Sequence, residues 1–327
     1  MDTDSSGTPP KPTLTPALAQ RLVAEVGKVV VGQEDVLELM LATFLAGGHL
    51  LFEGVPGLAK TLMVKALARA AGSAFSRIQF TPDLLPSDVI GTNVFDLAKT
   101  EFRFRPGPIF TGFLLADEVN RTPPKTQAAL LEAMEERTVS VDGETHRLPP
   151  RFTVFATQNP VEYEGTYPLP EAQLDRFLLN VRIDYPSEQG EREILRRYDA
   201  GFDPHDLAGA GVQAVLAPDD MPAIAKEVEA VHVDPGVMDY ILAIVRRTRR
   251  LRTVALGASP RAGIALLKAS KALAAIRGKP YITPDEVQTL APAVLRHRLL
   301  LTPESELEGG DVDSLITEFV STIPVPR

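Results

Sequence analysis

Apolar residues follow two different spacings along the chain, one typical of strands and one typical of helices. Short apolar runs suited to buried strands occur in HLLFEG, FSRIQF, GFLLADE, RFTVFATQN and FLLNVRIDY. Helical spacing occurs between them, in DVLELMLATFLAGG, TLMVKALARAAG and PPKTQAALLEAMEER. Strands separated by helices predict a parallel α/β sheet with helices on both faces, and ligands of such sheets bind at the carboxyl ends of the strands.

The strand pattern stops after about Pro186, and the later segments have helical spacing. They include DMPAIAKEVEAV, PGVMDYILAIVRRTRRL, PRAGIALLKASKALAAIRG and TPDEVQTLAPAVLRHRLL, which predict a second, all-α domain. The first residues, MDTDSSGTPPKPTLTP, combine acids and prolines without an apolar core, which is typical of a disordered tail and not of a secretory signal. We therefore expect a tail over 1–16, an α/β core over 17–188 and a helical domain over 189–327.

Two segments of the α/β core alternate in a way that predicts hairpins. NVFDLAKTEFRFRPG places Phe102 and Phe104 between arginines, and we expect it to form a hairpin inserted before the third strand. TVSVDGETHRL has Asp142-Gly143 between two alternating runs, which is a strong hairpin signal. Both hairpins therefore interrupt the α/β alternation without ending it.

Composition limits the classes of function. The chain has 327 residues, enough for about two domains, with 44% hydrophobic and 24% charged residues. Its formal net charge of -9 argues against nucleic-acid binding or attraction to an anionic membrane by the surface as a whole. No apolar run reaches the length of a membrane span, so we expect no membrane insertion. The absence of cysteine fits a cytoplasmic protein.

The stretch GVPGLAKT, at the end of the first strand, differs at one position from the phosphate-loop pattern G-x-x-x-x-G-K-[ST]. Glycines at 54 and 57 let the backbone approach phosphates, Lys60 reaches the β- and γ-phosphates, and Thr61 is placed to ligate Mg²⁺. Ala59 stands where the pattern has glycine; it fits at negative φ and otherwise carries about 1–2 kcal/mol of strain. We expect the phosphates to contact Gly54, Val55, Pro56, Gly57, Leu58, Ala59, Lys60 and Thr61.

A second motif, FLLADE, is an apolar strand that ends in two adjacent carboxylates. Burying two carboxylates at a strand end is costly unless a cation lies there. Mg²⁺ suits Asp117, and Glu118 can then polarise a water for attack on the γ-phosphate. The alternative is that Asp117 only caps the next helix. An acid pair of this kind favours hydrolysis over transfer to a small acceptor.

Three further polar residues lie at places where they can act on a phosphate. Asn159 follows the fourth strand and can orient the attacking water, although Asn before Pro is also a common turn signal. Arg176, just before the fifth strand, fits either an arginine finger that acts on a neighbouring subunit or a structural salt bridge with Asp175 or a nearby acid. Arg261 lies in the first turn of a helix, where a cation is unfavourable unless an anion such as phosphate comes close.

Together, VVGQE, GVPGLAKT, LLADEVNR, ATQNP, PEAQLDRF and GASPRA resemble the AAA+ ATPases of the MoxR family, over nearly the whole chain after the tail. The loop with Ala59 resembles the MoxR form of the phosphate loop. The first predicted hairpin resembles the insert of the helix-2-insert clade, which includes magnesium chelatase subunits. The resemblance makes Lys60 and Thr61 the Walker A pair and Asp117 and Glu118 the Walker B pair, and it gives Arg121 no secure role.

The same resemblance assigns the remaining site residues. It makes Asn159 the first sensor, Arg176 the arginine finger and Arg261 the second sensor. It places Gly32 and Gln33 near the adenine. It further implies ATP and Mg²⁺ as cofactors and a homo-oligomeric ring, usually a hexamer, with ATP sites between subunits. A partner that carries a von Willebrand factor A domain, and protein clients, are also implied.

Three classes of function are compatible with these features. A motor that hydrolyses ATP to remodel proteins, or to activate their metal or cofactor sites, is favoured. A nucleic-acid motor is disfavoured by the acidic charge and by the lack of a nucleic-acid-binding domain. A nucleotide-gated scaffold with little turnover is disfavoured by Glu118, and an ATPase assay decides it. A small-molecule kinase lacks an evident acceptor site.

One basic segment needs a separate interpretation. RRTRRLR carries five arginines between Arg246 and Arg252. Upstream, Met238, Ile241, Leu242 and Val245 are expected to form an apolar helical stripe, which leaves the arginines on the solvated side. We interpret the cluster as a solvated face or a contact between subunits.

Overall fold

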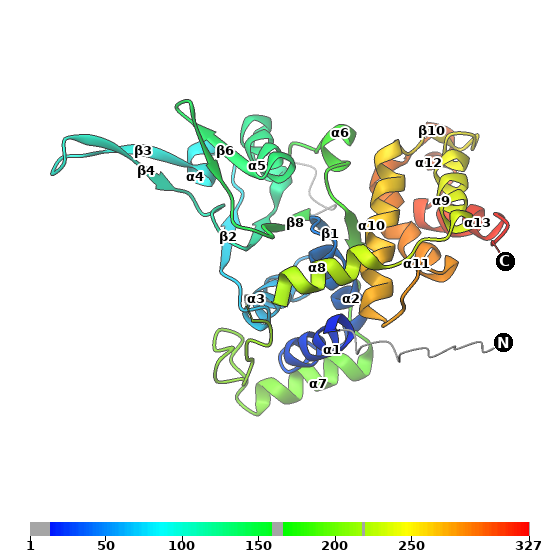
Figure 1. Cartoon of the computed structure of the whole chain (residues 1–327), viewed down its shortest axis with the longest axis horizontal. Helices are drawn as coiled ribbons and strands as arrows, with labels where there is room; N and C mark the ends of the chain where they lie inside the picture. The colour runs from blue at the N-terminus through cyan, green and yellow to red at the C-terminus, as the bar shows by residue number, and fades with distance from the viewer. Residues whose placement is uncertain (1–13, 159–165, 218–219, 327) are drawn as a thin grey trace, which may run out of the picture.

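A computed structural model describes residues 14–158, 166–217 and 220–326, arranged as an α/β part and a mainly helical part (Figure 1). Both parts confirm the fold class expected from the sequence. Asn159 lies outside the described residues. Helix α1 (Leu14–Gly27) begins inside the segment 1–16 that we expected to be a tail. The reason is local, because α1 buries Leu18, Leu22 and Val26 at helical spacing.

The central sheet is parallel and has the strand order β2-β5-β8-β1-β9. Its strands coincide with the five apolar runs of the sequence. All side chains of Leu50, Leu51 and Phe52 in β1 are fully buried, as expected for a central strand covered on both faces. The strands are β1 (Leu50–Glu53), β2 (Phe75–Gln79), β5 (Phe113–Asp117), β8 (Thr153–Gln158) and β9 (Leu179–Arg182).

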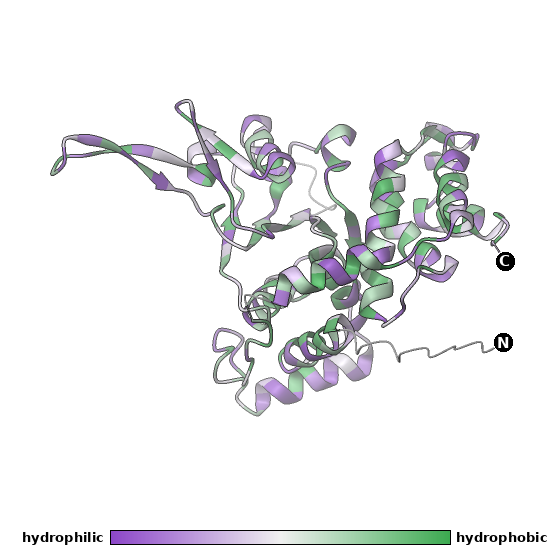
Figure 2. Ribbon diagram, in the orientation of Figure 1, coloured by the Kyte–Doolittle hydropathy of each residue, from purple (hydrophilic) through white to green (hydrophobic). Residues whose placement is uncertain are grey.

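Helices connect these strands and cover the sheet. Figure 2 shows hydrophilic residues along much of α7, the outermost helix next to α1, and only Gly190 of α7 is fully buried. Among the described residues, no helix combines the length and the apolar character needed to cross a bilayer. The helices of the α/β part are α1, α2 (Glu34–Leu45), α3 (Lys60–Ala70), α4 (Pro86–Ile90), η1 (Val119–Arg121), α5 (Pro124–Glu136), α6 (Glu171–Leu174) and α7 (Glu188–Asp199).

Both predicted hairpins are present. Strands β3 (Gly91–Asp96) and β4 (Glu101–Pro106) form a ribbon that projects away from the sheet (Figure 1), and β6 (Thr138–Val141) pairs with β7 (Glu144–Arg147). Nδ2 of Asn93 donates to Oδ2 of Asp142 at 2.8 Å, so the two hairpins contact each other through their polar edges.

The helical part is not wholly helical, because β10 (Val254–Leu256) pairs with β11 (Leu300–Leu301). The prediction of an apolar stripe on α9 was partly wrong as well. Met238 and Leu242 are 52% and 51% exposed, whereas Ile241 and Val245 are buried, and Leu242 lines a surface cavity together with Arg246 and Arg250. The helices are α8 (Asp220–Ala230), α9 (Pro235–Thr248), α10 (Pro260–Ile276), α11 (Pro284–Leu295), η2 (Arg296–Arg298), α12 (Pro303–Leu307) and α13 (Val312–Ser321).

A buried histidine next to β1 makes the stability of the fold depend on pH. The backbone N–H of Val154 donates to Nδ1 of His49 at 2.9 Å, and Nε2 lies 3.1 Å from the carbonyl oxygen of Met134, to which it donates. Burial lowers the pKa of His49 to about 3, and the Arg137 guanidinium adds to the effect. His49 is therefore neutral in the folded chain at pH 7.

We expect the free energy of unfolding to fall as the pH drops from about 6.5 towards 3, by up to about 1.4 kcal/mol per pH unit from His49 alone. Only the unfolded chain takes up the proton in this window, so stability is present above it and lost below it. Urea unfolding at pH 7, 6 and 5 measures the slope. His49→Gln should be less stable at pH 7 yet have a shallower slope, and the exposed His205→Gln should keep the wild-type slope. Equal slopes in all three proteins would contradict the role of His49.

Candidate nucleotide site

The loop between β1 and α3 has the backbone that close contact with an anion requires. Gly54 has φ +153° and Gly57 has φ +90°, conformations that L side chains rarely adopt. A Cβ at Gly54 would also lie 2.8 Å from the carbonyl oxygen of Ile183. Helix α3 begins at Lys60, so its first N–H groups are directed towards the loop. The arrangement is a backbone cradle at a helix N-terminus, which favours phosphate.

Of the two backbone conformations considered for Ala59, negative φ and the strained left-handed region, the structure has the left-handed one. Its φ is +56° and its ψ +19°, in the left-handed region, directly before α3. The cost for a residue with a Cβ is about 1–2 kcal/mol. The loop therefore keeps the shape that glycine gives at this position in the usual pattern, although the residue is alanine.

We expect Ala59→Gly to raise the free energy of unfolding by about 0.5–1 kcal/mol. Relief of left-handed strain exceeds the added entropy of the unfolded chain, which costs about 0.4–1 kcal/mol. Urea unfolding measures the change. Ala71→Gly is the matched control, because Ala71 has φ −78° and no strain to release, so that variant should be less stable. Equal destabilisation by both substitutions would show that the loop is not strained at Ala59.

A polar cavity of about 460 Å³ lies against this loop and holds the acid pair. Nζ of Lys60 donates to the carbonyl oxygen of Gly54 at the cavity. Burial lowers the pKa of Lys60, and the carboxylates of Asp117 and Glu118 act in the opposite direction. The lining residues include Gly54, Lys60, Thr61, Arg77, Gln79, Asp117, Glu118, Thr157 and Gln158. The structure thus brings both predicted Walker motifs to one cavity.

The acid pair is held by a threonine that sequence reasoning missed. Oγ1 of Thr157 donates to Oδ1 of Asp117 at 2.6 Å and accepts from the backbone N–H of Glu118 at 2.8 Å. Glu118 has φ +57°, and its N–H is therefore turned towards β8. The N-cap residue of η1 is Glu118, and the described partners of the Asp117 carboxylate are Arg77 and Thr157, so helix capping does not explain Asp117.

Two further side chains that the sequence analysis missed reach the acid pair from β2. Arg77 donates to Oδ2 of Asp117 through Nη2 at 2.6 Å and Nε at 3.1 Å, and Nε2 of Gln79 donates to Oε2 of Glu118 at 2.7 Å. Residues 77 and 79 share one face of β2, and the period-2 pattern of FSRIQF was the available signal. Arg121 gains a contact as well, since its Nε lies 3.2 Å from Oε2 of Glu118.

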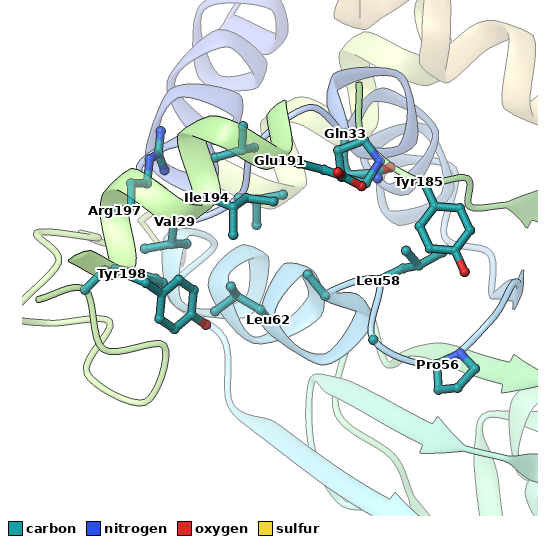
Figure 3. Close-up of a pocket in the computed structure, with 16 residues that line it drawn as sticks. Val29, Gln33, Pro56, Leu58, Leu62, Tyr185, Glu191, Ile194, Arg197 and Tyr198 are labelled. Atoms are coloured by element: carbon teal, nitrogen blue, oxygen red, sulfur yellow. The ribbon is translucent and has the colours of Figure 1, made fainter. Parts of the chain in front are cut away.

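A second, largely apolar cavity of about 290 Å³ adjoins the same loop (Figure 3). Gln33, which the resemblance places near the adenine, lines this cavity and donates from Nε2 to the carbonyl oxygen of Asp184 at 3.1 Å. Gly32 lines a neighbouring cavity instead. The walls of the apolar cavity come from the α1–α2 connection, the phosphate loop, the segment after β9, and α7. They include Val29, Val30, Pro56, Leu58, Leu62, Tyr185, Ile194 and Tyr198. An apolar cavity beside a phosphate cradle suits a flat base.

The two predicted arginines lie elsewhere. Neither Arg176 nor Arg261 lines the two cavities at the loop. Within the described residues Arg176 has no ion pair, and Asp175 pairs instead with Arg298 at 2.6 Å, so the expected alternative of an Arg176–Asp175 salt bridge is not formed. Nη2 of Arg261 lies 3.1 Å from Oε1 of Glu135. The structure therefore does not bring Arg261 to the phosphate cavity of its own chain.

The parallel sheet, the phosphate loop and the acid pair define a P-loop nucleotide-binding core, and the helical part follows it as a lid. Residues 49–179 match the ATPase family associated with various cellular activities (AAA), and residues 246–319 match an AAA lid domain. The chain belongs to the MoxR family of AAA+ ATPases.

Similar proteins cover nearly all of the chain. Chaperone MoxR1 of Mycobacterium tuberculosis is 43% identical over 94% of this chain and 82% of its own. Protein YeaC of Bacillus subtilis is 48% identical over 94% of this chain and 95% of its own. A solved structure from Cytophaga hutchinsonii matches with a TM-score of 0.87 and 40% identity, covering 96% of each chain.

Proposed function

We propose that this chain binds ATP with Mg²⁺ at the two cavities lined by the phosphate loop, hydrolyses it, and uses the energy to remodel protein clients. One observation carries the proposal: the phosphate loop and the Walker B acid pair line one cavity, and the same loop also lines a second, largely apolar cavity. A pocket that binds only a nucleobase would not need two carboxylates. In a site for a simple anion, the two carboxylates would repel the ligand.

The residues present fit the nucleotide and the metal. The loop backbone and Nζ of Lys60 bind phosphate oxygens, and the apolar cavity takes the base. Thr61 and Asp117 are the side chains that would hold Mg²⁺, which supplies charge neutralisation of the phosphates when bound. Glu118 accepts the proton of the attacking water. Gln79 and Arg121 hold the Glu118 carboxylate in place, and Thr157 orients the backbone beneath it.

We further propose that the complete site forms between subunits of a ring. Neither Arg176 nor Arg261 lines the cavities of its own chain, and the segments that carry them are connected through Asp175 and Ser259. Arginines that are not used within their own site are suited to the γ-phosphate of a neighbouring subunit. Six subunits, a von Willebrand factor A domain partner and client remodelling are proposals that rest on the family resemblance.

Replacing Lys60 with alanine tests the nucleotide assignment. We expect the affinity for ATP to fall by about 10- to 100-fold, because a charge-assisted contact with phosphate is lost. Phosphate release from ATP should fall with it. Isothermal titration calorimetry measures the affinity. Lys65→Ala, on the same helix but outside the cavity lining, should bind ATP as the wild type does. Unchanged affinity in Lys60→Ala would defeat the proposed site.

A further inference from the structure

The carboxylate of Asp175 joins the segment that carries Arg176 to the helical domain. Nε of Arg298, in η2, donates to Oδ1 at 2.6 Å, and Oγ of Ser259, at the start of α10, donates to Oδ2 at 2.9 Å. Both oxygens of one carboxylate are thus held by two separate elements of the helical domain. Asp175 itself ends helix α6, one residue before Arg176.

Arg298 is a fixed anchor and not a mobile surface side chain. Its side chain is only 3% exposed. Beyond Asp175, its guanidinium donates only to main-chain carbonyl oxygens: Asp175 at 3.2 Å, Phe177 at 2.6 Å, Leu178 at 3.3 Å, and Val294. Two of these carbonyls belong to the residues on either side of Arg176. The helical domain therefore holds the backbone immediately before and after this arginine.

The same contacts determine what Arg176 can bind. An aspartate adjacent in sequence is an available ion-pair partner, but both oxygens of Asp175 are already engaged. Within the described residues the guanidinium of Arg176 has no carboxylate partner, although its side chain is only partly exposed. If Asp175 lost Arg298 and Ser259, its carboxylate would be free to pair with Arg176 and neutralise it.

Ser259 extends the connection to the second arginine. Its Oγ also accepts the backbone N–H of Arg261 at 3.1 Å, which fixes the first turn of α10. The Asp175 carboxylate therefore links the segment that carries Arg176 to the helix turn that carries Arg261. A rotation of the helical domain would shift both.

We propose that Asp175 is a positioning residue, which couples the helical domain to the backbone that carries Arg176 and so holds this arginine for the neighbouring subunit. The inference rests on the proposed ring function, in which Arg176 reaches the adjoining site. Asp175 touches no nucleotide in this scheme. It acts by holding the backbone around Arg176 and by staying paired with Arg298.

Asp175→Asn tests the inference. The amide keeps the shape but weakens the contact with Arg298, so we expect turnover to fall by about 10- to 100-fold while ATP affinity stays within about twofold of wild type. Ser259→Ala removes only one hydroxyl, and we expect a fall of about 2- to 10-fold. Ser259→Thr keeps the hydroxyl and should restore turnover. Calorimetry and thermal unfolding check binding and folding, and Ser259→Ala serves alone if Asp175→Asn does not fold.

Mixing variants shows which face of the subunit is affected. Asp175→Asn mixed with Glu118→Gln should regain activity. Some interfaces of the mixed ring combine an intact Glu118 from one subunit with an Arg176 that is held by an intact Asp175 in its neighbour. Asp175→Asn mixed with Arg176→Ala should gain no activity beyond that of the two variants assayed separately, because both changes lie on the same side of the interface. Recovery in the second mixture, or none in the first, would overturn the positioning role.

The two levels of the proposal fail differently. Wild-type turnover in Asp175→Asn, alongside an inactive Arg176→Ala, would overturn only the positioning role. Wild-type turnover in Arg176→Ala would overturn both the ring mechanism and the role of Asp175. Loss of ATP affinity in Asp175→Asn would place its effect in the chain's own site and would also contradict the inference.

Discussion

We expect Glu118→Gln to bind ATP with nearly normal affinity and to hydrolyse it about 10²- to 10⁴-fold more slowly than the wild type. Glutamine has the shape of glutamate and still reaches Gln79, which lies 2.7 Å from Oε2 of Glu118. It has no carboxylate to accept a proton from water. Calorimetry measures the binding, and steady-state phosphate release measures the turnover.

The control for this change is an acid on the surface. Glu136 is exposed at the end of α5, and Glu136→Gln should hydrolyse ATP at the wild-type rate. Near-normal turnover in Glu118→Gln would remove Glu118 from the role of base and would favour a site that binds ATP without this chemistry. Loss of binding would instead show that Glu118 supports the nucleotide.

Arg176→Ala should also bind ATP normally and lose turnover, by about 10³-fold if its finger acts as strongly as those of well-studied phosphoryl-transfer enzymes. Normal binding follows because Arg176 does not line the cavities of its own chain. If the finger comes from a neighbouring subunit, as proposed, turnover per subunit of the wild type should rise with protein concentration. Arg192→Ala, an exposed arginine of α7, is the control.

A mixture of Arg176→Ala and Glu118→Gln gives the sharper test. Each variant is inactive alone, but some interfaces of a mixed ring combine an intact Glu118 with an intact Arg176. Partial activity is the expected result. If the subunits co-assemble and the mixture stays inactive, then Arg176 acts within its own chain or turnover needs every site. A wild-type rate in a strictly monomeric preparation would dismiss the finger.

Most of the fold was predictable because its signals are local. The five sheet strands are apolar runs, and the turn at Asp142-Gly143 specifies its hairpin by itself. The phosphate loop and the acid pair are contiguous motifs, and both were located correctly at one cavity. Helix α9 shows the limit of such signals. Met238 and Leu242 fit a helical stripe as well as the buried residues do, and only tertiary packing decides between the two faces.

The missed residues of the site depend on strand order. Arg77, Gln79 and Thr157 reach the acid pair only because β2 and β8 flank β5, and local spacing does not determine which strands are neighbours. The φ of Ala59 was undetermined for a related reason, since the alanine is compatible with either sign until the loop is fixed at both ends. Arg261 has a local signal for an anion, and that anion is Glu135 in the described chain.

The position of β1 in the sheet has a consequence for how the chain folds as it is synthesised. Leu50 pairs on one side with Phe155 and on the other with Leu179, each of which is translated about a hundred residues or more after it. Nη1 of Arg296, later still, donates to the carbonyl oxygen of Asn180 at 2.8 Å. The residues of the nucleotide cradle are therefore translated early, whereas the strands that flank β1 are translated late. A nascent chain that ends before β9 exposes the apolar edge of β1. An unpaired strand edge of this kind makes a nascent chain prone to aggregation until β9 is added.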